Sequence, residues 1–305
     1  MFSDSDAKLS SRNFRSKGSA SLNTDPKGRP DMPLALVTGG GGISLAAARR
    51  LGRSHRIVLA SDSASKNVAR LATLLEDGVD AVAAECDMTD PVSVAALKKF
   101  VAVHGPLRTL VHVAALSPTM GDWRDLFAVN LVGSALVEQA CLELVTAGSA
   151  AVFVASSAGY LAAPPVPEVV AVLDDPLAPD FLARLDALVE PEERTSLHAY
   201  RLSKFALRRM CRFRATAWGV KGARIVSMSP GSIATPMGAR ELTGPNREVK
   251  LDLMRKLPIQ RVGTMAETAD AIEFLVSDRA SYITGTDLLV DGGLVAGTRP
   301  DLSLA

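Results

Sequence analysis

A tyrosine and a lysine placed four residues apart form a pair that suggests proton transfer. Tyr200 and Lys204 lie in a segment whose apolar residues recur at three- and four-residue steps, which predicts a helix with both side chains on one face. A phenol whose pKa stays near 10 exchanges protons poorly at neutral pH, and a neighbouring ammonium lowers that pKa by favouring phenolate. The pair is a candidate acid–base device for a carbonyl/alcohol couple, although such spacing is also typical of a helix surface.

A glycine turn near the start of the chain predicts a nucleotide site. Residues 34–38 form a strand-like apolar run, Gly39 to Gly42 follow, and the residues from Ile43 to Leu51 have the composition of a helix. This order lets backbone N–H groups and a helix N-terminus bind a pyrophosphate, because glycine has no side chain to hold the phosphates away. The alternative is a flexible turn between ordinary elements.

The next strand, residues 55–60, is followed by an acidic residue. Asp62 lies about 20 residues after the glycines, the distance at which a carboxylate accepts hydrogen bonds from a ribose diol and repels a 2′-phosphate. No arginine follows it directly, and Lys66 is the nearest basic residue. The expected cofactor is therefore NAD(H), with NADP(H) as the second choice. Asp62 would also serve as the N-cap of a helix over 63–75.

Strands and helices continue to alternate, which predicts a doubly wound parallel α/β sheet of Rossmann type in one domain, residues 33–297. After a third strand over 79–85, Asp87 either accepts a hydrogen bond from an adenine amino group or holds a turn. Asp90 and Pro91 indicate an N-cap and the first residue of a helix. Further strands are expected at 110–114, 150–155, 222–228 and 287–290, and helices at 91–104, 122–145 and 266–276.

Two polar residues in the middle of the chain are candidates for the reacting end of the site. Asn130 and Gly133 are weak helix formers inside the helix 122–145, so we expect a local distortion there that frees a carbonyl for water. Ser157 follows the strand 150–155, at the edge where parallel sheets bind ligands. The plain alternatives are an exposed asparagine and a serine-rich loop.

The segment 161–197 separates Ser157 from Tyr200 and differs in character from the rest. Prolines break it repeatedly, and helical spacing is confined to 168–173 and 180–189. We interpret it as a helical insertion whose ends converge. It either walls the substrate pocket, or covers a surface that the neighbouring helices would otherwise offer to another subunit, or is a passive surface excursion.

Composition argues against several other classes. The 305 residues carry a formal net charge of +1, which gives no electrostatic reason to expect nucleic acid or an anionic membrane as a partner. No apolar run reaches membrane-spanning length, and no cluster suggests a metal. The three widely spaced cysteines are expected to be free thiols in a reducing, cytoplasmic compartment. Residues 1–32 are expected to be a disordered tail, and 298–305 a C-terminal tail.

Together these motifs resemble the short-chain dehydrogenase/reductase family, and within it the bacterial 3α-hydroxysteroid dehydrogenase/carbonyl reductases. Their order along residues 33–297 carries the resemblance, since no single motif is decisive. An insertion before the tyrosine and an arginine-rich tyrosine helix are also similar. The motifs are Thr38-Gly39…Gly42-Ile43, Asp87, Asn130…Gly133, Ser157, Tyr200-x-x-x-Lys204, Pro230-Gly231…Thr235 and Thr284-Gly285…Val290-Asp291-Gly292-Gly293.

The resemblance implies a role for each polar residue at the reacting end. Tyr200 would exchange the proton with the substrate oxygen, and Ser157, in preference to Ser156, would hold that oxygen in place. Lys204 would lower the pKa of Tyr200 and bind the nicotinamide ribose. Asn130 would hold a water that connects Lys204 to solvent.

Two departures from the family pattern affect the cofactor site. The glycine turn is one residue shorter than is usual in the family, and Ser44 stands at the position of the third glycine. Ser44 either forms a hydrogen bond to a phosphate, or the cofactor binds less tightly. His112 opens a stretch that replaces the usual Asn-Asn-Ala-Gly, and we expect it to be a structural substitute and not a base. The cofactor contacts that the resemblance implies are Gly39, Gly42, Ile43, Asp62, Asp87, Ala114, Tyr200 and Lys204, with Ile233 and Thr235 holding the nicotinamide carboxamide.

These observations predict an oxidoreductase that transfers a hydride between a nicotinamide cofactor and a secondary alcohol or ketone. The resemblance implies an apolar, ring-shaped or steroid-like substrate and a homodimer or homotetramer. The main alternative is a non-catalytic dinucleotide-binding sensor or scaffold, whereas a nucleotide-sugar epimerase would need a further C-terminal domain. The segment 235–257 either covers the cofactor as a lid or packs as plain helix. The expected pocket comprises the insertion and Leu116, Ser117, Pro118, Met120, Trp123, Leu161 and Met237.

Overall fold

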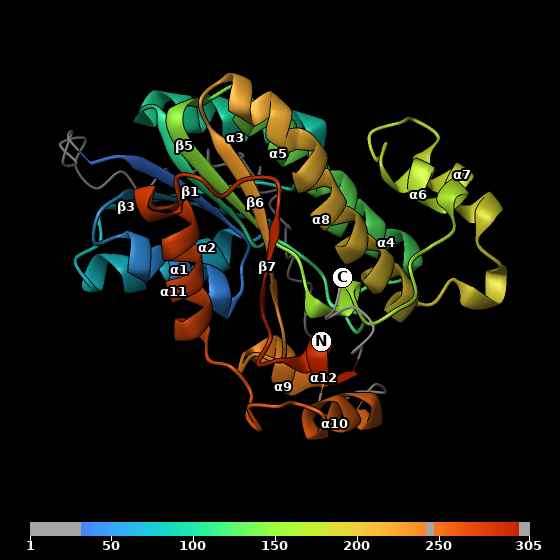
Figure 1. Ribbon diagram of the computed structural model, residues 1–305. Coiled ribbons are helices and arrows are strands. Elements are labelled where there is room, and N and C mark those ends of the chain that lie inside the picture. The colour runs from blue at the N-terminus through green and yellow to red at the C-terminus, as the bar shows by residue number, and fades with distance from the viewer. Residues whose placement is uncertain (1–31, 242–246, 299–305) are drawn as a thin grey trace, which may run out of the picture.

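A seven-stranded parallel sheet forms the centre of the protein (Figure 1). The structure, a computed structural model, describes residues 32–241 and 247–298. The strand order β3-β2-β1-β4-β5-β6-β7 starts in the middle of the sheet and reverses between β1 and β4, which is the predicted doubly wound arrangement. The strands are β1 (Leu34–Thr38), β2 (Arg56–Ser61), β3 (Ala81–Glu85), β4 (Leu107–His112), β5 (Val145–Val154), β6 (Arg224–Pro230) and β7 (Asp287–Val290).

Helices cover both faces of this sheet, as parallel strands require (Figure 1). On one face lie α1 (Gly42–Leu51), α2 (Ala64–Glu76) and α11 (Met265–Val276). On the other face lie α3 (Pro91–His104), α5 (Ser134–Leu142) and α8 (Ser196–Val220). The remaining helices are α4 (Trp123–Phe127), α6 (Pro167–Leu173), α7 (Phe181–Leu188), α9 (Pro236–Glu241), α10 (Arg247–Arg255) and α12 (Leu294–Thr298).

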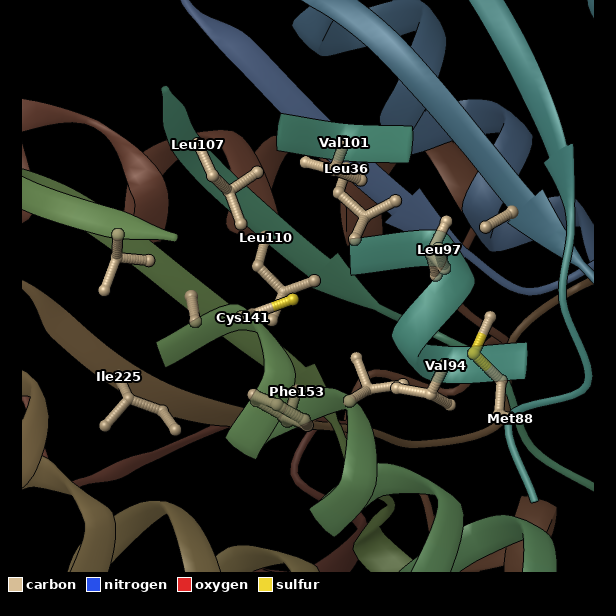
Figure 2. Packing of buried hydrophobic residues seen from close by; sticks show 14 of the residues in the cluster. Leu36, Met88, Val94, Leu97, Val101, Leu107, Leu110, Cys141, Phe153 and Ile225 are labelled. Carbon is tan, nitrogen blue, oxygen red and sulfur yellow. The ribbon is translucent and has the colours of Figure 1, made fainter. Parts of the chain in front are cut away.

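The core is divided by the sheet because strand side chains point alternately to its two faces. In β1, Leu34 and Leu36 pack toward α3, α5 and α8, whereas Ala35 and Val37 pack toward α1, α2 and α11. Figure 2 shows the first of these clusters, with Leu36 and Phe153 of the sheet facing apolar side chains of α3 and α5. All five residues of β1 are buried, which holds the glycine turn that follows on a rigid base.

The predicted long helix over 122–145 is interrupted where we expected a distortion. Between α4 and α5 the chain forms a π-helical segment, η1 (Ala128–Gly133), which contains Asn130. A Cβ on Gly133 would lie 3.0 Å from the carbonyl oxygen of Met88, so this position needs glycine for close packing.

The same stretch corrects the prediction that no apolar run reaches membrane-spanning length. Trp123–Leu142 is 20 residues long with a mean hydropathy of 1.3, enough to span a membrane by length and composition. Its burial explains this composition, because η1 and α5 pack against α8, and α5 also packs against α3. The stretch is thus a core helix of the domain.

The insertion folds as predicted into two short helices, α6 and α7, which lie beside α4 and α8 (Figure 1). Val172 and Leu185 of the insertion share a third apolar cluster with Phe127 and Leu202. The indole N–H of Trp123 donates a hydrogen bond of 2.9 Å to Asp186, which fastens α7 to α4. The insertion therefore covers the outer surface of α4 and α8.

Two further predictions concern the cysteines and the chain ends. Cys86, Cys141 and Cys211 are buried free thiols, as expected, and burial raises the pKa of each. The predictions for residues 1–31 and 299–305 lie outside the described residues.

Candidate active site

A cavity of about 680 Å³ lies along the carboxyl ends of the strands. Such an edge, at the point where the strand order reverses, is where open parallel sheets bind ligands. All ten predicted cofactor contacts line it, and so does Ser157. Asn130 is fully buried behind this wall and does not line it.

The glycine turn forms one end of the cavity. Gly39 has φ +95°, and a Cβ there would lie 2.7 Å from the backbone nitrogen of Ala114, so only glycine fits. Gly41 is the N-cap of α1 and offers no side-chain cap, which leaves first-turn N–H groups of Gly42 and Ile43 directed at the cavity edge. These groups suit a pyrophosphate, which helix N-termini bind through N–H groups and dipole.

Ser44 does not take the predicted phosphate-binding role. Its side chain is fully buried, and its hydroxyl donates a 2.7 Å hydrogen bond to the carbonyl of Gly41. The serine therefore closes the shortened turn from within. A Cβ on Gly42 would meet only the flexible end of the Met265 side chain in α11, which can move aside.

Three charged residues gather where an adenosine ribose would lie. Asp62, Lys66 and Arg70 all line the cavity, and a Cβ on Gly40 would lie 3.2 Å from Nη1 of Arg70. That nitrogen is buried and has no hydrogen-bond partner in the described part of the chain. Burial lowers the pKa of Arg70, while the nearby Asp62 carboxylate acts in the opposite direction.

The sequence prediction missed Arg70 because it considered only the residues directly after β2. A helix returns a side chain to the same face after three or four residues, so the signal was the Lys66–Arg70 spacing in α2. The predicted N-cap is also corrected: Ser63, not Asp62, caps α2 by accepting a hydrogen bond from the backbone N–H of Lys66.

Asp87 lies at the cavity edge after β3 and also holds a turn. Its Oδ1 accepts hydrogen bonds from the backbone N–H and the hydroxyl of Thr89, at 2.8 and 2.7 Å. Asp90 caps α3 and Pro91 follows at its first position, as predicted.

The reacting end of the cavity is formed by α8 and the turn after β5. Tyr200 and Lys204 lie one turn apart on α8, with the Lys204 ammonium 5.9 Å from the centre of the tyrosine ring. Ser157 begins a 3₁₀ turn, η2 (Ser157–Gly159), and a Cβ on Gly159 would lie 2.8 Å from the backbone nitrogen of Phe205. This close approach brings the serine turn against α8, so the topology brings all three side chains to one cavity.

The two neighbouring serines are distinguished by their hydrogen bonds. The hydroxyl of Ser156 accepts from the backbone N–H of Ala158 at 3.2 Å and so stabilises the turn. The hydroxyl of Ser157 lines the cavity without a hydrogen-bond partner among residues 32–241 and 247–298. Ser157 is therefore the serine available to a ligand.

Lys204 is almost completely buried and has no carboxylate partner within the described ranges. Its ammonium donates a 3.0 Å hydrogen bond to the carbonyl of Val154. Burial lowers the pKa of Lys204 to about 7, since the charged form loses its hydration.

His112 and Asn130 belong to a buried chain of hydrogen bonds behind the cavity. His112 contacts the Thr38 hydroxyl through Nδ1 at 2.8 Å and the Ser134 hydroxyl through Nε2 at 2.9 Å. Ser134 donates to the carbonyl of Asn130 at 2.9 Å, so Nε2 of His112 carries the proton. Burial and the charge of Lys204 lower the pKa of His112 to about 3, which makes it a neutral structural residue, as predicted.

Asn130 uses its side chain to hold the loop after β4. Its Oδ1 accepts from the backbone N–H of Leu116 at 2.7 Å, and its Nδ2 donates to the Leu116 carbonyl at 3.0 Å. A longer contact of 3.5 Å reaches the hydroxyl of Ser203 on α8. Asn130 thus connects the π-helical segment to one wall of the cavity.

The substrate half of the cavity is mostly apolar, and several predicted wall residues are confirmed. Leu116, Pro118, Met120 and Leu161 line it. Trp123 does not, because it is buried under the insertion, and Ser117 is buried away from the cavity. The predicted contribution of the Met237 side chain lies outside what the structure describes. Between its ends at Leu161 and Leu197 the insertion contributes no described residue to the lining.

Comparison with known proteins agrees with this geometry. Residues 33–168 match the family model for short chain dehydrogenases, and residues 189–295 match the model described as enoyl-(acyl carrier protein) reductase. The short-chain dehydrogenase/reductase bsc3 of Alternaria brassicicola is 31% identical over 268 residues, covering 88% of this chain and 97% of the relative. The chain belongs to the short-chain dehydrogenase/reductase family.

Two further members show the breadth of relatives around this short-chain dehydrogenase/reductase. D-threitol dehydrogenase of Mycolicibacterium smegmatis is 32% identical over 296 residues, 89% of this chain and 96% of the relative. The structure of the 3α-hydroxysteroid dehydrogenase from Pseudomonas sp. B-0831 complexed with NADH matches with a TM-score of 0.72 at 25% identity, over 88% of this chain and 98% of that one. The chain is accordingly an enzyme that acts on CH–OH groups with a nicotinamide cofactor.

Proposed function

We propose that the protein transfers a hydride between NAD(H) and a secondary alcohol or ketone on an apolar, ring-shaped molecule. The observation that carries the proposal is that one cavity contains both the glycine turn and the trio Ser157, Tyr200 and Lys204. A non-catalytic sensor would need the turn but not the trio. The similarity to a 3α-hydroxysteroid dehydrogenase supports a ring substrate, and the apolar wall formed by Leu116, Pro118 and Leu161 suits one.

The residues present fit a dinucleotide. Gly41, Gly42 and Ile43 would hold the pyrophosphate, Asp62 the adenosine ribose, and Asp87 the adenine amino group. Ile233 and Thr235 would hold the carboxamide at the opposite end, beside Lys204. When bound, the nicotinamide supplies or accepts the hydride, and the protein contributes orientation and electrostatics.

Three side chains would take part in proton transfer at the substrate oxygen: Tyr200, Ser157 and Lys204. The Tyr200 hydroxyl would give its proton to the oxygen of a ketone, or take it from an alcohol, while the unpartnered hydroxyl of Ser157 would position that oxygen. A lysine with a pKa of about 7 can gain or lose a proton at neutral pH, so Lys204 would restore the proton of Tyr200. The connecting water would bind at the carbonyl of Asn130, which has two lone pairs.

The cofactor preference depends on two opposing features of the ribose end. Asp62 favours a free ribose diol and would repel a 2′-phosphate, whereas Lys66 and the unpartnered Nη1 of Arg70 would attract one. We propose NAD(H) as the preferred cofactor, because Asp62 follows the strand at the ribose position. Because of Arg70, NADP(H) should also bind at this site, measurably but more weakly than NAD(H).

We further propose a homodimer or homotetramer in the cytoplasm. Family members are commonly oligomeric, and the insertion covers α4 and α8, which leaves other faces for contact. β7 is an edge strand whose Leu288 is partly exposed, and Tyr282 just before it is fully exposed. Three buried free thiols suit a reducing compartment.

Separate titrations with NADH and NADPH, followed by nucleotide fluorescence, test the nucleotide site. Wild type should bind NADH more tightly than NADPH. Asp62→Arg should reverse the order, and Arg70→Met should weaken NADPH about tenfold while changing NADH much less, because a charge-assisted hydrogen bond is lost. Exposed Arg53→Met is the matched control. Failure of wild type to bind either nucleotide would overturn the proposed function and favour the scaffold.

A further inference from the structure

Arginines that are at least partly buried in the described part of the chain nearly all have a partner. On α8 itself, Arg209 pairs with Asp174 at 2.7 Å, Arg214 pairs with Glu138 at 2.8 Å, and Arg208 donates to the carbonyl of Gly159 at 3.2 Å. Two arginines of this kind, Arg70 and Arg201, have neither an ion pair nor a hydrogen bond within residues 32–241 and 247–298. Both line the cavity, at its opposite ends.

The position of Arg201 follows from the register of α8. Leu197, Tyr200, Arg201 and Lys204 recur at three- and four-residue steps, and all four line the cavity. Arg201 is thus fixed on the same helix face as the proposed proton donor, one residue after it. Arg201 is half-buried, and this burial lowers the pKa of its guanidinium.

No acidic side chain among the described residues neutralises the positive charge of Arg201. The acidic side chains that line the cavity, among described residues, are Asp62 and Asp87, which follow β2 and β3 at the nucleotide end. On α8, Leu197 lies one turn before Arg201 and the basic Lys204 one turn after it, and both line the same cavity. A partly desolvated guanidinium without an acceptor is unfavourable, and an anionic ligand would remove that cost.

We propose that Arg201 binds an anionic group of the substrate, so that the enzyme acts on an apolar hydroxy or oxo acid with its carboxylate at a distance from the reacting carbon. A guanidinium offers the planar, two-pronged donor geometry that a carboxylate accepts. The inference rests on the proposed function, because it assigns a substrate class to the same cavity. Arg201 is then a specificity-determining residue.

Equilibrium binding of two unreactive molecules of similar shape tests this without turnover. Calorimetry would compare cyclohexanecarboxylate with neutral cyclohexanecarboxamide in the presence of NAD⁺. Wild type should prefer the carboxylate, and Arg201→Met should weaken the carboxylate about 10- to 100-fold with a smaller effect on the amide. Arg201→Lys should restore part of the affinity, and salt should weaken only the carboxylate. The matched control is Arg212→Met, an exposed arginine on the same helix.

Turnover of 4-oxocyclohexanecarboxylate and cyclohexanone separates the two proposals. The ratio of their kcat/KM values should favour the acid in wild type and fall at least tenfold in Arg201→Met, mainly through KM. If wild type reduces neither ketone while the carboxylate still binds through Arg201, the proposed reaction fails and the anion site stands. The inference is overturned if wild type shows no preference for the carboxylate, or if Arg201→Met weakens carboxylate, amide and NADH equally.

Discussion

His112 shows how one unusual residue is accommodated beside a charged site. The imidazole replaces an asparagine of the family pattern and joins β1, β4 and the helix of Asn130 through Thr38 and Ser134. Its pKa is lowered to about 3, mainly by burial and further by the charge of Lys204. A neutral imidazole that is hydrogen-bonded at both nitrogens is therefore part of the folded state.

This arrangement predicts an acid-sensitive stability. Between pH 6.5 and about 3 the unfolded chain protonates His112 but the folded chain does not, so the stability falls as the pH falls through that range. The loss between pH 7 and pH 5 should be about 2 kcal/mol from this residue. Urea unfolding of wild type and His112→Asn at both pH values measures it. Between pH 7 and pH 5, the free energy of unfolding of the variant should fall by about 2 kcal/mol less than that of wild type. Equal decreases in both proteins would contradict the assignment.

Among individual residues, the sequence predicted those whose place in the site follows from their position relative to a strand end or a helix face. Gly39, Ser157, Tyr200 and Lys204 follow strands or share a helix face, so topology alone brings them together. Arg201 was not predicted, because its importance depends on which other arginines find partners. That is a property of the packed molecule and not of any segment.

The insertion is the element that most distinguishes this chain. Helical spacing between its prolines predicted two short helices, at 168–173 and 180–189, and the structure confirms them. Of the uses we considered, packing supports the cover over α4 and α8, while the lining of the cavity stops at the insertion's ends. The sequence did not decide this, because helical spacing shows which face is apolar but not which surface it packs on.

The insertion should therefore contribute to stability without contributing to nucleotide binding. Leu185 of α7 is fully buried in the cluster shared with α4 and α8. Leu185→Ala should lower the free energy of unfolding by about 2–5 kcal/mol while leaving the NADH dissociation constant unchanged. Leu188→Ala on the same helix, where the side chain is 44% exposed, should cost less than about 0.5 kcal/mol. A loss of NADH affinity in folded Leu185→Ala would instead place the insertion at the site.

At the scale of the whole molecule, the alternation of strands and helices was sufficient to predict the sheet and its doubly wound order. The two halves of the chain meet at the cavity: β1 to β3 supply the nucleotide end, β5, β6 and α8 supply the reacting end, and the loop after β4 supplies apolar wall residues of the substrate half. The helix Trp123–Leu142 was misjudged because the buried face of a core helix can raise its mean hydropathy to that of a membrane span. The shape of the substrate pocket was also beyond prediction, since it depends on how the loops after β4 and β5 pack against α8.

The central claim is that Tyr200 transfers the proton in a reaction driven by a nicotinamide cofactor. The most direct measurement is ketone-dependent oxidation of NADH by wild type and Tyr200→Phe, with NADH affinity determined in parallel. We predict turnover by wild type, a decrease in kcat of about 10²–10⁴-fold in the variant, and NADH affinity within a few-fold of wild type, because only the hydroxyl is removed. Undiminished turnover by Tyr200→Phe, or turnover that depends on no nicotinamide nucleotide, would contradict the account.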